Sequence, residues 1–423
     1  MLDVKYIRNN PELAKKKLIS RGVSSFEIEA FLALDADWRG KIVETDTLKQ
    51  KRNAASEEIG KLKRQGQDTG EKQQEVRSIG EQIKVLDETV VILEEKCRTF
   101  LLETPNFPHD SVPLGDASYN KIVYEWGDKR QFSFSPKSHW DIGEKLGILD
   151  LASASKISGS MFALYRGLGS HLERALINWM LDLHISKHGY TEVWPPFLVR
   201  REIMVGTGQL PKFENEMYRC DADDLFLIPT AEVPVTNIHR EEIIARGTLP
   251  IYYVAYSPCF RREAGASGKD TRGLLRLHQF NKVEMVNFVT PETSYDEHEK
   301  LRRNAEEVLE LLDIPYRTVL LASSDMGAAA AKCYDLEAWA PGVGQWLEVS
   351  SCSNFEDYQA RRANIRFRRE PKSKPEFVHT LNASGIALPR TVIAILENYQ
   401  EEDGSVTIPK VLRPYMGGRE KIL

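Results

Sequence analysis

The segment from Phe260 to Met285 is the densest candidate in this chain for side chains that do chemistry. Its pattern predicts a strand, a loop that contains Gly and Ser, and a second strand that carries Glu284. Six basic residues fall inside it: Arg261, Arg262, Lys269, Arg272, Arg276 and Lys282. A planar guanidinium can donate paired hydrogen bonds to a phosphate or a carboxylate. The segment therefore predicts an anion site, against the alternative of a basic hairpin at the surface.

A second candidate runs from His379 to Gln400. Its sequence predicts a Ser/Gly turn that leads into an amphipathic helix, with Pro389 and Arg390 near the helix start. The start of a helix presents free N–H groups and the positive end of the helix dipole to an anion. The alternative for a single arginine at this place is a surface ion pair.

Two shorter segments are weaker when taken alone. Thr230-Ala231-Glu232 is a tripeptide that can arise by chance, and Glu348 in Glu348-Val349-Ser350-Ser351 can equally be a structural ion-pair partner. Phosphate-binding loops of the types GxxxxGK[ST] and GxGxxG are missing, so any nucleotide must be held by another arrangement.

The elements that must position these residues follow residue 115. We expect a long amphipathic helix from about Ser170 to His188. Short β-prone runs begin at Leu225, Ile251, Val283, Tyr316 and Trp346 without regular alternation with helices. This order predicts an α+β fold in which helices pack on an antiparallel sheet.

Before this region, residues 26–101 repeat apolar side chains at alternating three- and four-residue spacing, broken only at residues 65–70. The repeat predicts a long antiparallel coiled-coil hairpin, with arms that reach on the order of 50 Å. Lys49 to Arg64 holds six basic and two acidic residues, which fits a surface for phosphates or an ordinary solvated helix face. We expect an N-terminal arm domain over 1–105, a linker over 106–115 and a catalytic domain over 116–423.

Composition and charge limit the classes of protein to which this chain can belong. The 423 residues have a net charge of -5, so binding to nucleic acid has to rest on local patches. The five cysteines are dispersed without zinc-ligand spacing, which predicts no zinc and fits a reducing cytoplasm. The chain lacks a signal-peptide pattern and an apolar run of membrane-spanning length, so we expect a cytoplasmic protein.

Together, these segments resemble class II aminoacyl-tRNA synthetases, and specifically the seryl-tRNA synthetase family along nearly the whole chain. Residues 260–285 are similar to motif 2 of that class, residues 379–400 to motif 3, and HGYTEVWPPFLV at 188–199 to motif 1. In this family, Thr-Ala-Glu belongs to the serine site, and Glu-Val-Ser-Ser resembles the strand that contacts ATP and Mg²⁺.

The resemblance implies two adjoining substrate sites. For ATP it implies that Arg261 holds the α-phosphate, Phe280 stacks on adenine and Arg390 binds the γ-phosphate; the full set is Arg261, Arg262, Glu263, Phe280, Glu348, Val349, Ser350, Ser351 and Arg390. Arg261 would also hold the carboxylate of serine. The serine set is Thr230, Ala231, Glu232, Arg261, Glu284, Asn382 and Ser384, with roles still undivided among Thr230, Glu232, Glu284 and Ser384.

The resemblance also implies partners and a metal. Mg²⁺ would accompany ATP at Glu348 and Ser351, and Pro196 would lie at a homodimer interface. Serine tRNA, and selenocysteine tRNA where it exists, would contact the arm at Lys49, Lys51, Arg52, Lys61, Lys63 and Arg64. Lys269 and Arg272 would lie near its acceptor end.

The sequence departs from the family pattern at two informative places. Ala383 stands where glycine is usual and is expected to affect the serine pocket slightly, and Met161 stands where arginine is common. Three alternatives are a catalytically dead paralogue, a class II enzyme for another amino acid, and a homologue that loads a carrier protein. The retained Arg261, Glu284, Glu348 and Arg390 argue against the first. The arm and the Thr-Ala-Glu segment argue against the second, and the arm argues against the third.

Overall fold

The chain is seen in a computed structural model that describes residues 1–264 and 271–423. It divides into two compact units, one of Asp3–Thr104 and the other of Met1–Leu2 with Pro105–Leu423. Asn106, in the segment expected as a linker, packs within the larger unit: its Nδ2 donates to the main-chain oxygens of Ala329 (3.0 Å) and Phe355 (2.8 Å).

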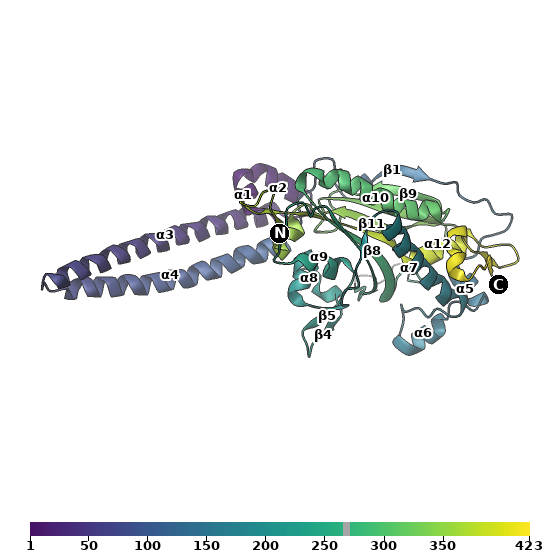
Figure 1. Cartoon of the computed structure of the whole chain (residues 1–423), viewed down its shortest axis with the longest axis horizontal. Helices are drawn as coiled ribbons and strands as arrows, with labels where there is room; N and C mark the ends of the chain where they lie inside the picture. Colours follow the sequence, from purple (N-terminus) through teal and green to yellow (C-terminus); the bar gives the residue numbers. More distant parts are fainter. Residues whose placement is uncertain (265–270) are drawn as a thin grey trace. The chain divides into compact units, whose positions relative to one another are not determined.

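The smaller unit is entirely helical where it has regular structure. Its four helices are α1 (Val4–Asn9), α2 (Pro11–Ile19), α3 (Ser25–Arg64) and α4 (Gly70–Glu103). Ser24 and Glu27 form a capping box that starts α3. Helices α3 and α4 run antiparallel as a long hairpin, with Lys49 paired to Asp87 at 2.9 Å (Figure 1). The stacked rings of Phe31 and Phe100 lie near its base, 4.5 Å apart. The predicted coiled-coil hairpin is confirmed.

The larger unit is built on an eight-stranded sheet in the order β1-β9-β10-β11-β14-β8-β7-β2. The strands are β1 (Lys121–Trp126), β2 (Thr191–Glu192), β7 (Ile251–Phe260), β8 (Gln279–Val289), β9 (Tyr316–Leu320), β10 (Lys332–Ala340), β11 (Gln345–Asn354) and β14 (His379–Ala387). Every neighbouring pair is antiparallel except β2 and β7. The predicted antiparallel α+β architecture is confirmed.

The remaining elements of this unit are helices and short strands, and the short strands form three separate small sheets. The helices are α5 (His139–Lys145), α6 (Leu151–Ser158), α7 (Leu168–Ser186), α8 (Arg201–Thr207), α9 (Glu232–Thr236), α10 (Ser294–Leu311), α11 (Tyr358–Ala363) and α12 (Leu388–Asn398). The minor strands are β3 (Leu198–Arg200), β4 (Arg219–Cys220), β5 (Leu225–Leu227), β6 (Ile243–Ile244), β12 (Arg366–Phe367), β13 (Glu376–Phe377), β15 (Val406–Thr407) and β16 (Lys421–Ile422). Among the described residues, no helix combines the length and the apolar character that crossing a membrane requires.

Side chains of β8 alternate between the two faces of the sheet, as a strand requires. Val283 and Met285 pack into the main core with α7, α10 and α12, whereas Val286 and Phe288 pack into a second core with α9 and α11. Lys282 and Glu284 share the parity of Val286, so they lie on the face that the three long helices leave uncovered. That face holds the candidate site.

The prediction of a Ser/Gly turn before the motif 3 helix is wrong. Residues His379–Ala387 form the buried strand β14, which pairs with both β8 and β11. The sequence of this strand resembles that of a turn because Asn382 and Ser384 are polar. Their side chains supply polar groups to the cavity and not to solvent. Ala383 points the other way into the main core, so it does not belong to the serine pocket as expected.

Candidate functional site

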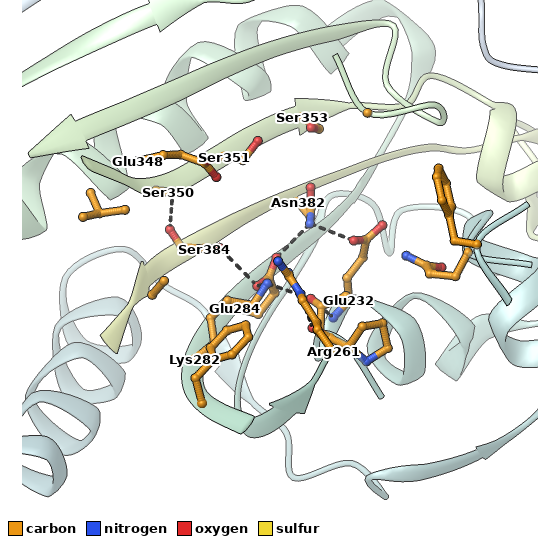
Figure 2. Close-up of a pocket in the computed structure, with 18 of the residues that line it drawn as sticks. Glu232, Arg261, Lys282, Glu284, Glu348, Ser350, Ser351, Ser353, Asn382 and Ser384 are labelled. Carbon is orange, nitrogen blue, oxygen red and sulfur yellow. Dashed lines mark hydrogen bonds and ion pairs between the residues drawn. The ribbon is translucent and has the colours of Figure 1, made fainter. Parts of the chain in front are cut away.

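A cavity of about 550 Å³ lies on the open face of the sheet. Such a volume suits a ligand of small-molecule size. Its lining includes these residues expected from the sequence: Thr230, Glu232, Arg261, Glu263, Phe280, Glu284, Glu348, Val349, Ser350, Ser351, Asn382, Ser384 and Arg390. Strands β7, β8, β11 and β14 therefore bring together segments that lie far apart in the sequence (Figure 2).

Two buried carboxylates that line the cavity, those of Glu232 and Glu284, share one side-chain amide. Asn382 Nδ2 donates to Glu232 Oε2 at 3.1 Å and to Glu284 Oε1 at 2.8 Å (Figure 2). The Ser384 hydroxyl lies 3.5 Å from Glu284 Oε2. The arrangement offers acceptor oxygens for an ammonium group and for a hydroxyl side by side.

Lys282 balances one of the two carboxylates. Its Nζ lies 2.5 Å from Glu284 Oε2 and donates to Thr230 Oγ1 at 2.8 Å. Because Lys282 and Glu284 are both buried, neither charge can rely on solvent, and each requires the other. Glu284 is thereby neutralised within the protein, and Glu232 lacks a cation of its own in direct contact among the described residues.

Glu232 is held by the side-chain amide of Gln359, a buried residue outside the cavity lining. Gln359 Nε2 donates to Glu232 Oε1 at 2.6 Å, while Gln359 Oε1 accepts from the Thr380 hydroxyl at 2.8 Å. Burial, reinforced by the nearby charge of Glu284, raises the pKa of Glu232 to about 7. A neighbouring cation, such as the ammonium group of an amino acid, would favour the ionised form of this carboxyl.

Arg261 and Phe280 form the next part of the cavity. The guanidinium carbon of Arg261 lies 5.1 Å from the centre of the Phe280 ring, and its Nε donates to the Pro229 carbonyl at 3.4 Å. Arg276 Nη1 donates to Glu263 Oε2 at 2.9 Å. An aromatic face beside a guanidinium suits a base and the phosphate attached to it.

Arg390 extends the cationic lining from the start of α12. Its Nη1 donates to the Glu348 carbonyl at 2.6 Å and lies 3.5 Å from Glu348 Oε2. Burial, together with the nearby charge of Glu348, raises the pKa of Asp335 on the neighbouring strand β10. Glu348 and Ser351 both line this part of the cavity, and hard divalent cations prefer carboxylate and hydroxyl oxygens of this kind.

Two residues expected at the substrate sites, Ala231 and Arg262, lie outside the cavity lining, as do the described residues expected to contact tRNA or a second subunit. Ala231 is buried in the second core, and Arg262 is exposed outside the cavity. Arg272 is exposed and stacks over the Trp140 ring at 4.5 Å, whereas Lys269 falls outside the described residues. Pro196 is exposed on the larger unit. The six basic residues of the arm are on α3 in the smaller unit.

Two buried residues at the serine end were not singled out from the sequence. Lys282 was visible only as one of several basic residues in motif 2, and Gln359 lies in a segment that carries no motif signal. The two-residue spacing of Lys282 and Glu284 along a strand is the one signal that places Lys282 on the same face as the glutamate.

Family comparisons cover both units. Residues 1–108 match the seryl-tRNA synthetase N-terminal domain, and residues 213–399 match the class II tRNA synthetase core domain (G, H, P, S and T). A serine–tRNA ligase of Carboxydothermus hydrogenoformans is 57% identical over 99% of this chain and 98% of its own length. One from Geobacillus kaustophilus is 56% identical over the whole of both chains.

Solved structures agree with the sequence relatives. The structure of seryl-tRNA synthetase from Pyrococcus horikoshii complexed with ATP superposes with a TM-score of 0.94 at 43% identity, over 100% of this chain and 99% of that one. A cytoplasmic serine–tRNA ligase from Naegleria fowleri in complex with AMP gives a TM-score of 0.90 at 31% identity, over 100% and 98%. Because the similarity spans both the helical arm and the sheet, the chain belongs to the seryl-tRNA synthetase family.

Proposed function

We propose that this protein activates L-serine with ATP and transfers it to the 3′ end of serine tRNA. The observation that carries the proposal is the cavity itself, which places the Glu232–Asn382–Glu284 network beside Arg261, Phe280 and Arg390. The acceptor oxygens at one end suit a small zwitterion with a hydroxyl. The aromatic and cationic side chains at the other end suit a base and phosphates. A catalytically dead paralogue is disfavoured because these groups converge in one cavity.

The geometry supports a division of the roles that the sequence left open. Glu232 would accept the ammonium group of serine because no cation among the described residues contacts it, and Arg261 would receive the carboxylate. Glu284 and Ser384 receive the hydroxyl, since Lys282 already balances the charge of Glu284. Alanine would leave these buried groups unpaired, which costs about 1–3 kcal/mol.

The first chemical step needs no nucleophilic side chain. The serine carboxylate attacks the α-phosphate of ATP and pyrophosphate leaves in line, so the protein orients the reactants and neutralises developing charge. Arg261 and Arg390 supply positive charge at the α- and γ-phosphates. A terminal ribose hydroxyl of tRNA then attacks the seryl-adenylate, forming the ester and releasing AMP.

Mg²⁺ is part of the proposal at the ATP end of the cavity. Glu348 and Ser351, which both line the cavity, would hold it, because Mg²⁺ prefers oxygen ligands such as a carboxylate and a hydroxyl. When bound, Mg²⁺ would neutralise charge on the phosphate oxygens. Arg390, anchored to the Glu348 carbonyl, remains aimed at the same phosphates.

The remaining proposals concern the whole chain. Residues 1–105 would bind serine tRNA, and selenocysteine tRNA where it exists, through the basic side chains of α3, while 116–423 would carry the chemistry in the cytoplasm. A homodimer would form around Pro196. Trp194 (67% exposed) and Leu198 (45% exposed) flank this proline and provide an apolar surface of the kind that an interface covers.

The direct test is aminoacylation. Purified protein with ATP, Mg²⁺ and labelled serine should transfer label to serine tRNA, and the label should be lost on mild alkaline hydrolysis of the ester. An R261A variant, which removes the shared ligand of both substrates, serves as the inactive control. Failure of the unaltered protein to charge serine tRNA would contradict the proposal.

A further inference from the structure

A buried carboxylate near the end of α12 collects four donors. Glu397 Oε1 accepts from the main-chain N–H of His139 (2.9 Å) and lies 2.8 Å from His139 Nδ1, while Oε2 accepts from the main-chain N–H groups of Gly342 (2.8 Å) and Val343 (3.0 Å). Both Glu397 and His139 are fully buried. The pair lies outside the cavity lining, and the proposed chemistry does not use it.

The second nitrogen of His139 faces a different segment. The main-chain N–H of Leu274 donates to His139 Nε2 at 3.0 Å. Because a main-chain N–H can only donate, Nε2 must be the acceptor, and the ring proton then sits on Nδ1 and points at Glu397. His139 is therefore a neutral bridge with a fixed tautomer between α12 and Leu274.

Gly273 makes the close approach possible. Its φ of +67° lies in the left-handed region, and a Cβ there would collide with His139 Nε2 and crowd Trp140. The chain thus turns tightly against the ring just before Leu274. Arg272, one residue earlier, stacks on Trp140, the neighbour of His139.

The segment held in this way forms one wall of the cavity. Leu274, Leu275, Arg276 and Leu277 all line it, and Arg276 donates to Glu263 at 2.9 Å. The serine end depends on other segments, because Glu232 begins α9 and Glu284 lies in β8. A displacement of 274–277 would therefore reach Glu263 and the nucleotide end first.

We propose that His139 is a positioning residue for ATP: it fixes the 274–277 wall against α12 through the Glu397–His139–Leu274 hydrogen-bond chain. This inference rests on the proposed ATP-dependent function and deepens it. His139 lies outside the cavity lining and acts through the 274–277 wall, so its effect should appear in ATP binding and spare serine binding.

Two matched substitutions separate the hydrogen bond of the His139 ring to Glu397 from its hydrogen bond to Leu274. In H139N the short amide can still donate to Glu397 from the place of Nδ1, but it cannot reach Leu274. In H139Q the longer side chain brings Oε1 to the place of Nε2, where it accepts from Leu274. We expect H139N to raise the KM for ATP about tenfold, the factor that corresponds to about 1.4 kcal/mol, and to change the KM for serine less than about twofold.

H139Q is the rescue variant and should keep the KM for ATP within about threefold of the unaltered protein. G273A should also weaken ATP binding, since the added methyl displaces the ring and strains the backbone beside Leu274 at a φ of +67°. Thermal unfolding of all three variants, measured alongside, reports the structural contribution of the bridge.

Isothermal calorimetry with ATP in the absence of any amino acid tests the role of His139 in ATP binding without depending on serine being the substrate. Weak ATP binding by H139N and G273A with near-normal binding by H139Q supports the positioning role, even if serine were the wrong substrate. Equal losses in H139N and H139Q, or a rise in the KM for serine that parallels the rise for ATP, would overturn it.

Discussion

At the scale of single residues, the serine end of the cavity is governed by charge balance in a buried space. Glu232 and Glu284 are both buried and are joined through Asn382, yet among the residues that the structure describes a lysine contacts Glu284 and none contacts Glu232. Like charges that approach in a dry pocket disfavour joint ionisation. The unbalanced carboxyl of Glu232 is thereby matched to a ligand that brings its own positive charge.

The raised pKa of Glu232 predicts how activity depends on pH. The ammonium group needs an ionised partner, so kcat/KM for serine should rise as pH increases through about 7 and level off above it. The measurement is pyrophosphate exchange at limiting serine from roughly pH 5.5 to 8.5. E232Q should be strongly impaired at every pH. A flat profile across neutrality for the unaltered protein would contradict the role of Glu232.

Glu173 on α7 gives a stability prediction outside the site. Burial raises the pKa of its carboxyl to about 7, and Asn281 supplies a single hydrogen bond at 3.1 Å. The folded state then binds more protons than the unfolded state between the ordinary carboxyl pKa and 7, so the free energy of unfolding falls as pH rises through that window. The total fall is on the order of 3 kcal/mol.

Denaturant unfolding across pH checks this point. E173Q carries no titrating proton and should lose this part of the pH dependence, becoming relatively more stable than the unaltered protein above pH 7. The comparison requires only the difference between the two proteins at each pH. Parallel stability curves would show that Glu173 does not titrate as its burial indicates.

At the scale of elements, the sequence predicted those helices and strands whose hydrophobic periodicity reflects the surface that they bury. The heptad-like spacing in α3 and α4 and the apolar runs of β7 and β8 reflect the surfaces that these elements bury. Strand β14 was misread because its alternate residues Asn382 and Ser384 face a cavity, so a buried strand carries the composition of a turn. The need for polar side chains in the cavity here outweighs the alternation of residues that is typical of a buried strand.

Long-range partners were beyond sequence reasoning for a different reason. Gln359 reaches Glu232 across 127 positions of the chain, and His139 reaches Leu274 across 135. Neither contact leaves a periodic trace, because each depends on how strands and helices are ordered in the sheet. Motif residues such as Arg261 and Arg390 could be named in advance through the family resemblance.

The basic end of α3 yields a prediction for tRNA binding. Changing Lys61, Lys63 and Arg64 to glutamine should weaken tRNA binding and flatten its salt dependence, by about 0.7–0.9 units of log–log slope for each phosphate that the variant no longer neutralises. A control with Lys410, Arg419 and Lys421 of the larger unit changed to glutamine has the same net charge and should bind normally. Filter binding over a salt series measures both. Equal effects of the two triple variants would mean that only overall charge matters.

At the scale of the whole molecule, the chain is two compact units with different composition and different proposed tasks. The larger unit contains every residue of the cavity, and the smaller unit contains the basic residues of α3. Amino-acid activation should therefore be separable from tRNA charging.

Shortening the arm tests this separation. Replacing residues 44–90 by a short Gly/Ser turn removes the distal hairpin and keeps the base, where Phe31 stacks on Phe100. We expect pyrophosphate exchange to stay near normal, because the cavity is untouched, and tRNA charging to fall by at least about a hundredfold, a loss of roughly 2.7 kcal/mol. Normal charging by the shortened protein would refute the role of the arm.

The central claim is that the cavity selects serine and activates it with ATP. Amino-acid-dependent ATP–pyrophosphate exchange, compared across all twenty amino acids without tRNA, tests it most directly. Serine should give the fastest exchange, with alanine and glycine at least about tenfold slower because they leave Glu284 and Ser384 without the hydroxyl. Absence of exchange with serine, or faster exchange with another amino acid, would contradict the claim.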